Sequence, residues 1–243
     1  MFDFFRKFFI DGFQRGDYTL GTTHVFALVF TVLSIALLVF LLKGKNEEYV
    51  YKRMKLIAYI TILVYLARRG IMVYQGETFL KAFWPFYLCN VNTILLSIWI
   101  IFDFKKGLDF MIITGISGAV LAFIVPEGVF TDRYLNFQIL DSILSHYEIV
   151  AVPIVLLATK TYKLDVKNSW IVMIGILLIL INVELLQPLI INEKVDYLFL
   201  DGNLPFTING VPQVYILLFC MISYVYIVYY LNYLYNKKME MIL

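Results

Sequence analysis

Hydrophobic residues fall into seven long runs along this chain, separated by short segments rich in charged residues, Gly or Pro. A helix needs about 20 mainly apolar residues to cross the hydrocarbon core of a bilayer. The pattern therefore predicts an all-α, multi-pass membrane protein, a bundle of about seven transmembrane helices in a single membrane domain. The predicted spans are 24–42, 54–74, 84–102, 109–125, 139–158, 169–190 and 212–235.

The N-terminus shows a different pattern, with a polar side chain at every third or fourth position. Asp3, Lys7, Asp11 and Gln14 would share one helical face, and phenylalanines populate the other. This arrangement is typical of an amphipathic helix that lies in the membrane interface. We therefore predict an interfacial helix over residues 1–16, and not a signal peptide, because the segment has no uninterrupted apolar core.

Composition and charge place the chain in lipid and give it an orientation. The chain is 61% hydrophobic and 16% charged, whereas soluble domains are about 45–50% apolar and about 25% charged. Twelve of the 20 Lys and Arg residues fall on one side of the predicted bundle and six on the other. The positive-inside rule then predicts an outside N-terminus and a cytoplasmic C-terminus in the cell membrane. Membrane lipids are the expected partners. The net charge of +2 indicates no nucleic-acid partner, and no protein partner is evident.

Polar residues inside the predicted spans are the most informative features, because each costs roughly 2.5–3.5 kcal/mol to insert and faces the bundle interior. They are Arg68 and Arg69; Cys89, Asn90 and Asn92; Asp141, Ser145, His146 and Glu148; and Asn182, Glu184 and Gln187. One residue in each of these four spans lies roughly 7–11 Å below the predicted outer boundary, at a rise of about 1.5 Å per residue. These four are Arg69, Cys89, His146 and Glu184. We therefore predict one buried polar pocket that opens toward the outer leaflet or the exterior. A purely structural network that holds the helices together is the alternative.

Two further features concern packing and access. Thr114 and Gly118 form a pair of small residues four positions apart, which favours a close approach between helices. The connection over residues 190–211 is rich in turn formers and aromatic residues. It is predicted to fold over the outer mouth of the bundle as a lid or plug, and a plain loop is the alternative.

Cys89 and His146 point to covalent chemistry. A thiol becomes a strong nucleophile when a neighbouring base or cation lowers its pKa, so His146 is a candidate base for Cys89. The arginine pair of the second span could stabilise the thiolate or an oxyanion. Asn92 lies on the same helical face as Cys89, and Ser142 lies one turn before His146, where it could orient the ring. A cysteine in a span more often serves packing, and that interpretation stays open.

Other catalytic signatures are missing from the sequence. His24 and His146 are its two histidines, so it contains no metal-ligand spacing. It also has no phosphate-binding glycine loop, no Gly-x-Ser-x-Gly elbow and no dinucleotide-binding fingerprint. We therefore expect no metal and no cofactor.

Three segments carry a resemblance: FWPFYLCNVNTILL in the third span, SHYEIVAVPIVLL in the fifth and DYLFL after the sixth. Together they resemble the YwaF-like family of integral membrane proteins, whose animal relatives are the transmembrane-protein-164 acyltransferases. The family's Pro-x-His-Leu-Cys motif reads Pro85-Phe86-Tyr87-Leu88-Cys89 here, with tyrosine in place of histidine. Its Asn-Tyr-x-Phe-Leu motif reads Asp196-Tyr197-Leu198-Phe199-Leu200. The resemblance implies acyl transfer between membrane lipids, with a thioester on Cys89 and His146 as its base.

Two functional hypotheses follow, and a scaffold role also stays open. The first is a lipid acyltransferase or thioesterase near the outer leaflet, in which Arg68 or Arg69 holds the headgroup phosphate. The second is a non-catalytic binding or transport protein for a small anionic solute. The substrate-binding candidates are Arg68, Arg69, Asn92, Glu184 and Gln187. A Cys89 sulfur within hydrogen-bond reach of an imidazole favours the first hypothesis, and a sulfur buried against aliphatic side chains favours the second.

Overall fold

The fold is helical, as the sequence predicts. The computed structural model describes residues 2–85, 87–124, 129–191, 210–211 and 213–240. Within these residues the chain forms helices and connections, with one isolated antiparallel bridge between Arg15 and Asp132. The chain divides into two compact units, residues 1–163 and 164–243, and each is described by itself.

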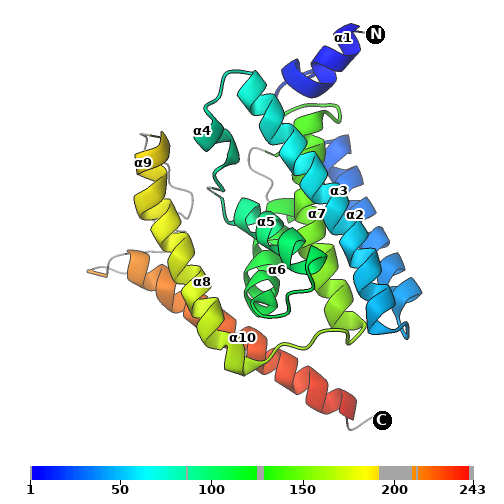
Figure 1. Ribbon diagram of the computed structural model, residues 1–243, viewed down its shortest axis with the longest axis vertical. Helices are drawn as coiled ribbons and strands as arrows, with labels where there is room; N and C mark the ends of the chain where they lie inside the picture. Colours follow the sequence, from blue (N-terminus) through cyan, green and yellow to red (C-terminus); the bar gives the residue numbers. More distant parts are fainter. Residues whose placement is uncertain (1, 86, 125–128, 192–209, 212, 241–243) are drawn as a thin grey trace. The chain divides into compact units, whose positions relative to one another are not determined.

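The first unit consists of a short N-terminal helix followed by the helices of a bundle (Figure 1). Its elements are α1 (Phe2–Arg6), the π-helical turn η1 (Lys7–Asp11), α2 (Thr22–Leu42), α3 (Glu47–Tyr74), α4 (Phe79–Phe83), α5 (Leu88–Ile101), α6 (Leu108–Ile124) and α7 (Phe137–Ala158). The N-terminal helix ends at Asp11, before the predicted limit of residue 16. It ends there because Gly12 adopts a φ of 78°, in the left-handed region that stops a helix.

Asparagine side chains fix the starts of the two longest helices of this unit. Asn46 Oδ1 accepts the Tyr49 N–H at 2.8 Å before α3, and Asn136 Oδ1 accepts the Ile139 N–H at 2.9 Å before α7. Asn is among the best N-cap residues, because its side chain satisfies an N–H that has no partner within the helix. As a result α7 begins two residues before the predicted span, and Gln138 lies in its first turn.

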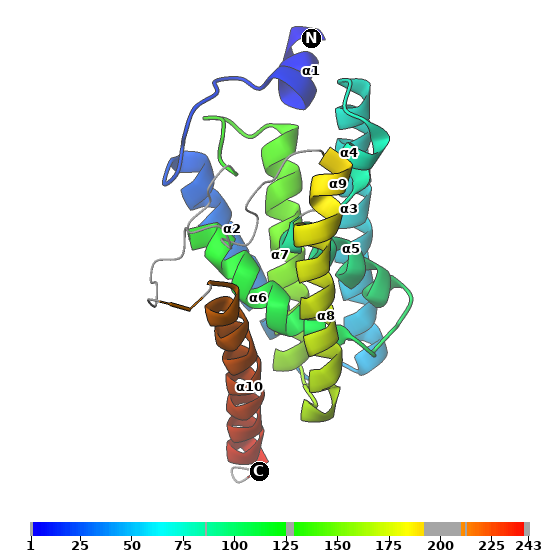
Figure 2. The ribbon, with the colours of Figure 1, turned by 90° about the vertical axis from the view of Figure 1, so that its left-hand side faces the viewer.

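Helix α7 is the centre of the first unit. It packs against α2, α3, α5 and α6, and Figures 1 and 2 show it running alongside α2 and α3, with α5 and α6 beside it. Most of α7 is buried, whereas α2 and α3 are mainly exposed and apolar over their membrane-spanning windows. This combination suits a bundle in which α7 is enclosed by protein and the outer helices face lipid.

Gly115 on α6 lies in close contact with α7. A Cβ on Gly115 would lie 2.6 Å from Ile149 Cγ2, so this position has no room for a side chain larger than that of glycine. A Cβ on Gly118 would have Leu88 Cδ2 as its nearest contact, at 3.9 Å. The predicted small-residue contact is therefore centred on Gly115, next to Thr114, and not on Gly118.

Five stretches of described helix have the length and composition of a membrane span. They are Thr22–Leu42, Glu47–Tyr74, Phe137–Ala158, Val166–Ile190 and Leu218–Lys237. The third and fourth predicted spans are shorter apolar helices, Leu88–Ile101 and Leu108–Val120. The third starts late, at Leu88, because Trp84 before Pro85 is extended, as a residue before proline prefers, and because its N-cap Tyr87 is extended as well. The chain is thus a multi-pass membrane protein. The total of seven spans and the orientation of the termini stay predictions.

The second unit contains the last two hydrophobic runs. Its elements are the 3-10 turn η2 (Val166–Asn168), α8 (Ser169–Ile181), the π-helical turn η3 (Asn182–Leu186), α9 (Gln187–Ile191) and α10 (Gln213–Glu240). Most of the predicted lid over 190–211, and the motif residues Asp196 to Leu200 within it, lie outside the described residues.

Candidate functional site

The N-terminal segment is anchored to the first unit through one carboxylate. Asp132 accepts the backbone N–H groups of Phe13 at 2.5 Å, Gln14 at 3.0 Å and Tyr134 at 3.0 Å. Burial alone would raise the pKa of Asp132, but these N–H donors, with the Asn136 side chain, hold it below its usual range. The carboxylate therefore joins the N-terminal segment to the loop that leads into α7.

Glycine is required where the segment passes this carboxylate. A Cβ on Gly12 would lie 2.6 Å from Asp132 Oδ2, and its φ of 78° is unfavourable for other residues. Two backbone hydrogen bonds extend the pairing: Gly16 N–H donates to Thr131 O at 3.1 Å and Tyr18 N–H to Phe130 O at 3.0 Å. On the other side of the segment, the Phe9 and Phe137 rings meet with centroids 5.0 Å apart.

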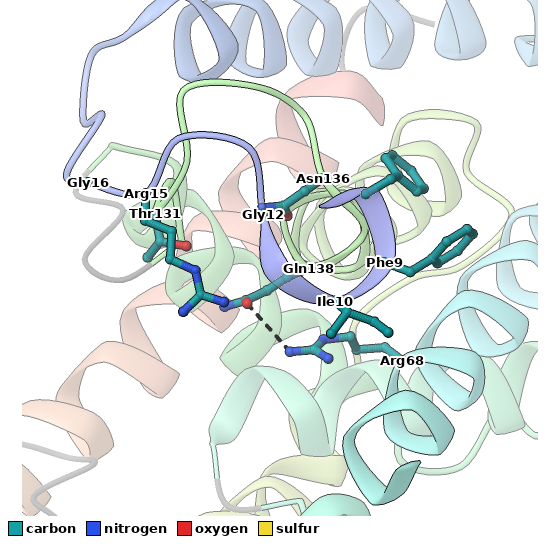
Figure 3. A pocket seen from close by; sticks show the side chains of 10 residues that line it. Phe9, Ile10, Gly12, Arg15, Gly16, Arg68, Thr131, Asn136 and Gln138 are labelled. Carbon is teal, nitrogen blue, oxygen red and sulfur yellow. Dashed lines mark hydrogen bonds between the residues drawn. The ribbon is translucent and has the colours of Figure 1, made fainter. Parts of the chain in front are cut away.

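A cavity of about 310 Å³ lies where the N-terminal segment meets the C-terminal part of α3 and the start of α7 (Figure 3). Its lining combines aromatic and aliphatic side chains with two guanidinium groups and two side-chain amides. The lining residues are Phe8, Phe9, Ile10, Gly12, Arg15, Gly16, Arg68, Thr131, Asn136 and Gln138. We call this region the polar end of the bundle. Figure 3 shows Arg15 and Arg68 reaching toward Gln138 from different elements.

Arg68 is held at the cavity by long hydrogen bonds. Its Nη2 donates to Gln138 Oε1 and its Nη1 to Gln75 Oε1, both at 3.4 Å. Gln75 in turn donates to Ile10 O at 3.4 Å, which connects α3 to the N-terminal helix. A guanidinium has five N–H donors. Within the described part of the chain, Arg68 therefore keeps donors that no protein oxygen accepts.

Arg69 has a different environment, because successive residues on a helix point about 100° apart. Its Nη2 lies 3.9 Å from Asp141 Oδ2, and these two side chains are 14% and 10% exposed. Its guanidinium carbon lies 4.3 Å from the centroid of the Tyr65 ring, a cation–π arrangement. Arg69 thus lies inside the bundle, where its Nε and Asp141 Oδ1 have no hydrogen-bond partner among the described residues, whereas its neighbour Arg68 faces the cavity.

Cys89 lies in the first turn of α5, partly buried. It packs against an apolar cluster that includes Phe123 and Ile149. Its Sγ makes a long contact of 3.9 Å with Asn90 Oδ1, and no imidazole nitrogen is hydrogen-bonded to it among the described residues. The charges of Arg69 and Asp141 are close enough to act on the thiol.

His146 is buried on α7 beside the same apolar cluster, where its ring meets Phe123 edge-on with centroids 5.9 Å apart. Its Nδ1 lies 2.7 Å from Ser142 O and 3.4 Å from Ser142 Oγ. A carbonyl oxygen can only accept, so Nδ1 carries the proton and the neutral ring has its lone pair on Nε2. The backbone and the side chain of Ser142 both contact the ring, as a role in orienting it requires.

Two of the remaining polar residues of the spans form separate pairs in the bundle interior. Thr114 Oγ1 donates to Asn92 Oδ1 at 3.2 Å, and Ser97 Oγ donates to Glu148 Oε1 at 2.8 Å. All four side chains are buried. The described residues thus show local pairs in the interior and a cavity at the polar end, and the predicted single pocket stays a prediction. Cys89 and His146 do not line that cavity.

Glu184 and Gln187, predicted to share the site, belong to the second unit. Glu184 is exposed in the π-helical turn η3, and Gln187 is buried at the start of α9.

Comparison with known proteins gives one positive finding. Residues 19–235 match a family model described as the TMEM164 family. Neither the curated proteins nor the solved structures gave a match. The matched region covers helices α2 to α7 of the first unit and begins after the N-terminal helix and Arg15.

Proposed function

Because the chain belongs to the TMEM164 family, we propose that it is a membrane-embedded lipid acyltransferase or thioesterase with Cys89 as nucleophile and His146 as base. The observation that carries this proposal is the hydrogen bond from His146 Nδ1 to the Ser142 carbonyl oxygen, at 2.7 Å. It fixes the tautomer that a general base needs, with the lone pair on Nε2. Cys89 and His146 also pack against one apolar cluster, which includes Phe123.

The proposed first step transfers an acyl group from a phospholipid to the thiol. His146 Nε2 accepts the Sγ proton, and the thiolate attacks the ester carbonyl carbon. The C–S bond forms, the bond from that carbon to the glycerol oxygen breaks, and the departing oxygen takes the proton back from His146. The products are a Cys89 thioester and a lysophospholipid. Attack by a lipid hydroxyl then completes transfer, and attack by water completes hydrolysis.

The surroundings of Cys89 bear on this chemistry in two ways. The charge of Arg69 acts on Cys89 and would stabilise a tetrahedral oxyanion, whereas the burial of the thiol and the charge of Asp141 oppose a thiolate. The apolar cluster around the thiol strengthens contacts to an oxyanion formed in the reaction, but such packing is also what the second hypothesis expects of Cys89. The described residues show no hydrogen bond between Cys89 and His146, and catalytic contacts often tighten only when substrate binds.

The second candidate is a binding or transport protein for a small anionic solute. It is favoured by the lack of a hydrogen bond between Cys89 and His146 among the described residues, and by Arg15 and Arg68 at the polar end. In that case Cys89 is packing material, and its replacement by serine leaves the interaction with lipid or solute unchanged.

A turnover experiment separates the two candidates. The purified protein is incorporated into phosphatidylcholine nanodiscs, and the release of lysophosphatidylcholine is followed by mass spectrometry. We expect Cys89→Ser to lower the rate at least about 100-fold, and His146→Gln about 100-fold or more. Cys220→Ser is the matched control, because Cys220 is the other free cysteine and is exposed on α10. An equal rate in the wild type and in Cys89→Ser contradicts the proposed mechanism.

A further inference from the structure

We propose that the cavity at the polar end binds the phosphate group of a lipid headgroup between Arg15 and Arg68. This inference rests on the proposed function, because the bound phospholipid would be the acyl donor or acceptor. It also separates two residues that the sequence leaves as equivalent, since it assigns the phosphate to Arg68 and not to Arg69.

The described residues that line the cavity carry a net positive charge. Arg15 and Arg68 contribute two positive charges, and no carboxylate belongs to the described residues that line the cavity. The carboxylate of Asp132, which follows the lining residue Thr131 in the chain, is occupied by three backbone N–H donors. Guanidinium groups pair with phosphate through charge-assisted hydrogen bonds. An anion in the cavity therefore meets two cations, and the charge of Asp141 acts on one of them, Arg68.

Arg15 and Arg68 also keep hydrogen-bond donors that could bind a ligand. Arg68 makes two hydrogen bonds of 3.4 Å, at the long limit for such contacts. Arg15 donates from Nε to Asp11 O at 2.8 Å, which holds the side chain in place and leaves its terminal nitrogens available. Arg69 does not line the cavity: it lies in the interior, with its Nη2 3.9 Å from Asp141 Oδ2 and its guanidinium over the Tyr65 ring. The side-chain amides of Asn136 and Gln138 can supply neutral donors beside the two arginines.

The position of the cavity favours a lipid as the source of the phosphate. The N-terminal helix that forms one wall exposes Phe2, Phe4 and Phe5 on its outer side, as expected for a helix lying at the headgroup level. Gln138 at the cavity is eight residues before His146 on α7, about 12 Å along the helix axis. The ester bonds of a phospholipid lie below its phosphate, toward the acyl chains. A headgroup held at Gln138 therefore directs the ester toward the level of His146.

The test measures binding in protein that cannot react. Cys89→Ser protein in detergent is titrated with dihexanoylphosphatidylcholine, and the bound lipid is counted by native mass spectrometry. Adding Arg15→Gln and Arg68→Gln should weaken binding about tenfold or more, because hydrogen bonds to charged groups are lost. The matched control adds Arg53→Gln and Arg133→Gln instead. Arg53 contacts Tyr49 in the first turns of α3 and Arg133 stacks near Tyr134, so neither lines the cavity.

Three further measurements keep the outcome clear. The Arg15→Lys, Arg68→Lys protein should regain part of the affinity, which shows that charge and not misfolding is measured. Dihexanoylglycerol, which lacks the phosphate, should bind weakly and equally to all variants. Inorganic phosphate that displaces the short-chain lipid identifies the phosphate group alone as the ligand, whereas failure to displace it identifies the whole headgroup.

Equal affinity of the double glutamine variant and its parent would overturn the assignment of the cavity. Because binding is measured without Cys89, that result leaves the proposed chemistry untouched. Conversely, full binding together with no Cys89-dependent turnover refutes the chemistry and leaves the cavity assignment standing.

Discussion

The polar end of the bundle and its interior use the same kinds of side chain in opposite ways. In the interior, Ser97 and Glu148 meet at 2.8 Å and are completely enclosed. At the polar end, Arg68 reaches its two amide partners only at 3.4 Å, beside a cavity of about 310 Å³. The pair of Ser97 and Glu148 joins α5 to α7, whereas the long contacts of Arg68 leave some of its donors unused. Polarity inside a membrane helix thus marks a contact between helices in one region and, under the proposed function, a binding site in the other.

The largest expected effect removes the carboxylate that anchors the polar end. Asp132→Ala deletes the acceptor for the N–H groups of Phe13, Gln14 and Tyr134. Hydrogen bonds to charged groups contribute about 1.5–3 kcal/mol each, so the N-terminal segment should be loosened by at least about 3 kcal/mol. Hydrogen–deuterium exchange should show at least about 100-fold faster exchange of the 13–18 amides. Unchanged exchange would mean that Asp132 is not the anchor.

The next effect tests the packing of the interior. Gly115→Ala places a methyl group where Ile149 Cγ2 would be 2.6 Å away, so α6 and α7 must separate. Overpacking of this kind costs about 1–3 kcal/mol. Gly118→Ala is the matched control on the same helix, because its new methyl group has 3.9 Å of clearance. The midpoint of thermal unfolding in detergent should fall for the first variant only, and equal midpoints would contradict the described contact.

A smaller effect tests the polar pairs of the interior. Ser97→Ala removes the donor to Glu148 Oε1 and should lower the free energy of unfolding by about 1 kcal/mol, without changing the turnover of lipid. Ser117→Ala serves as control, because Ser117 Oγ contacts only carbonyl groups of its own helix, at 3.3 Å and 3.5 Å. A large loss of turnover in Ser97→Ala would contradict a purely structural role for Glu148 and would assign it a role in the reaction.

The smallest effect is a pH dependence confined to the polar end. The pKa of Asp132 lies below its usual range when the chain is folded. A carboxyl group with a lowered pKa stabilises the fold above the pKa of the unfolded chain, about 3.9, and loses this contribution as the pH falls through the folded pKa. Exchange of the 13–18 amides, corrected for intrinsic rates, should stay constant from pH 7 to about pH 5 and rise below about pH 3.9. Asp132→Asn should abolish the rise, and a rise that persists in this variant would assign it to another group.

The sequence was sufficient for the elements whose signal is local. Seven hydrophobic runs correspond to described helices, because an apolar stretch in lipid has little alternative to a helix. The contact of Ser142 with His146 was also predictable, since residues four apart on a helix share a face. The start of α5 was predicted too early. A hydrophobic pattern takes no account of Pro85, which disfavours a helical conformation for the residue before it.

Features that depend on distant pairing were not predictable in the same way. Asp132 lies in a loop, and its partners Phe13 and Gln14 are more than a hundred positions away. Arg15 was assigned to an interfacial helix that in fact ends at Asp11. Arg68 and Arg69 were indistinguishable by depth, because one residue of rotation decides which guanidinium meets Asp141 and which faces the cavity. Depth along a helix can be read from one sequence, but the direction in which a side chain points requires its neighbours.

The central claim, that Cys89 carries the acyl group, is tested most directly by the mass of the intact protein. Wild-type protein mixed with excess phosphatidylcholine and quenched in acid should gain the mass of one acyl chain. Neutral hydroxylamine should remove this mass, and peptide mapping should place it on Cys89. An acyl mass on Cys220 or on any other side chain, or no added mass in protein that releases lysophosphatidylcholine, would contradict the account.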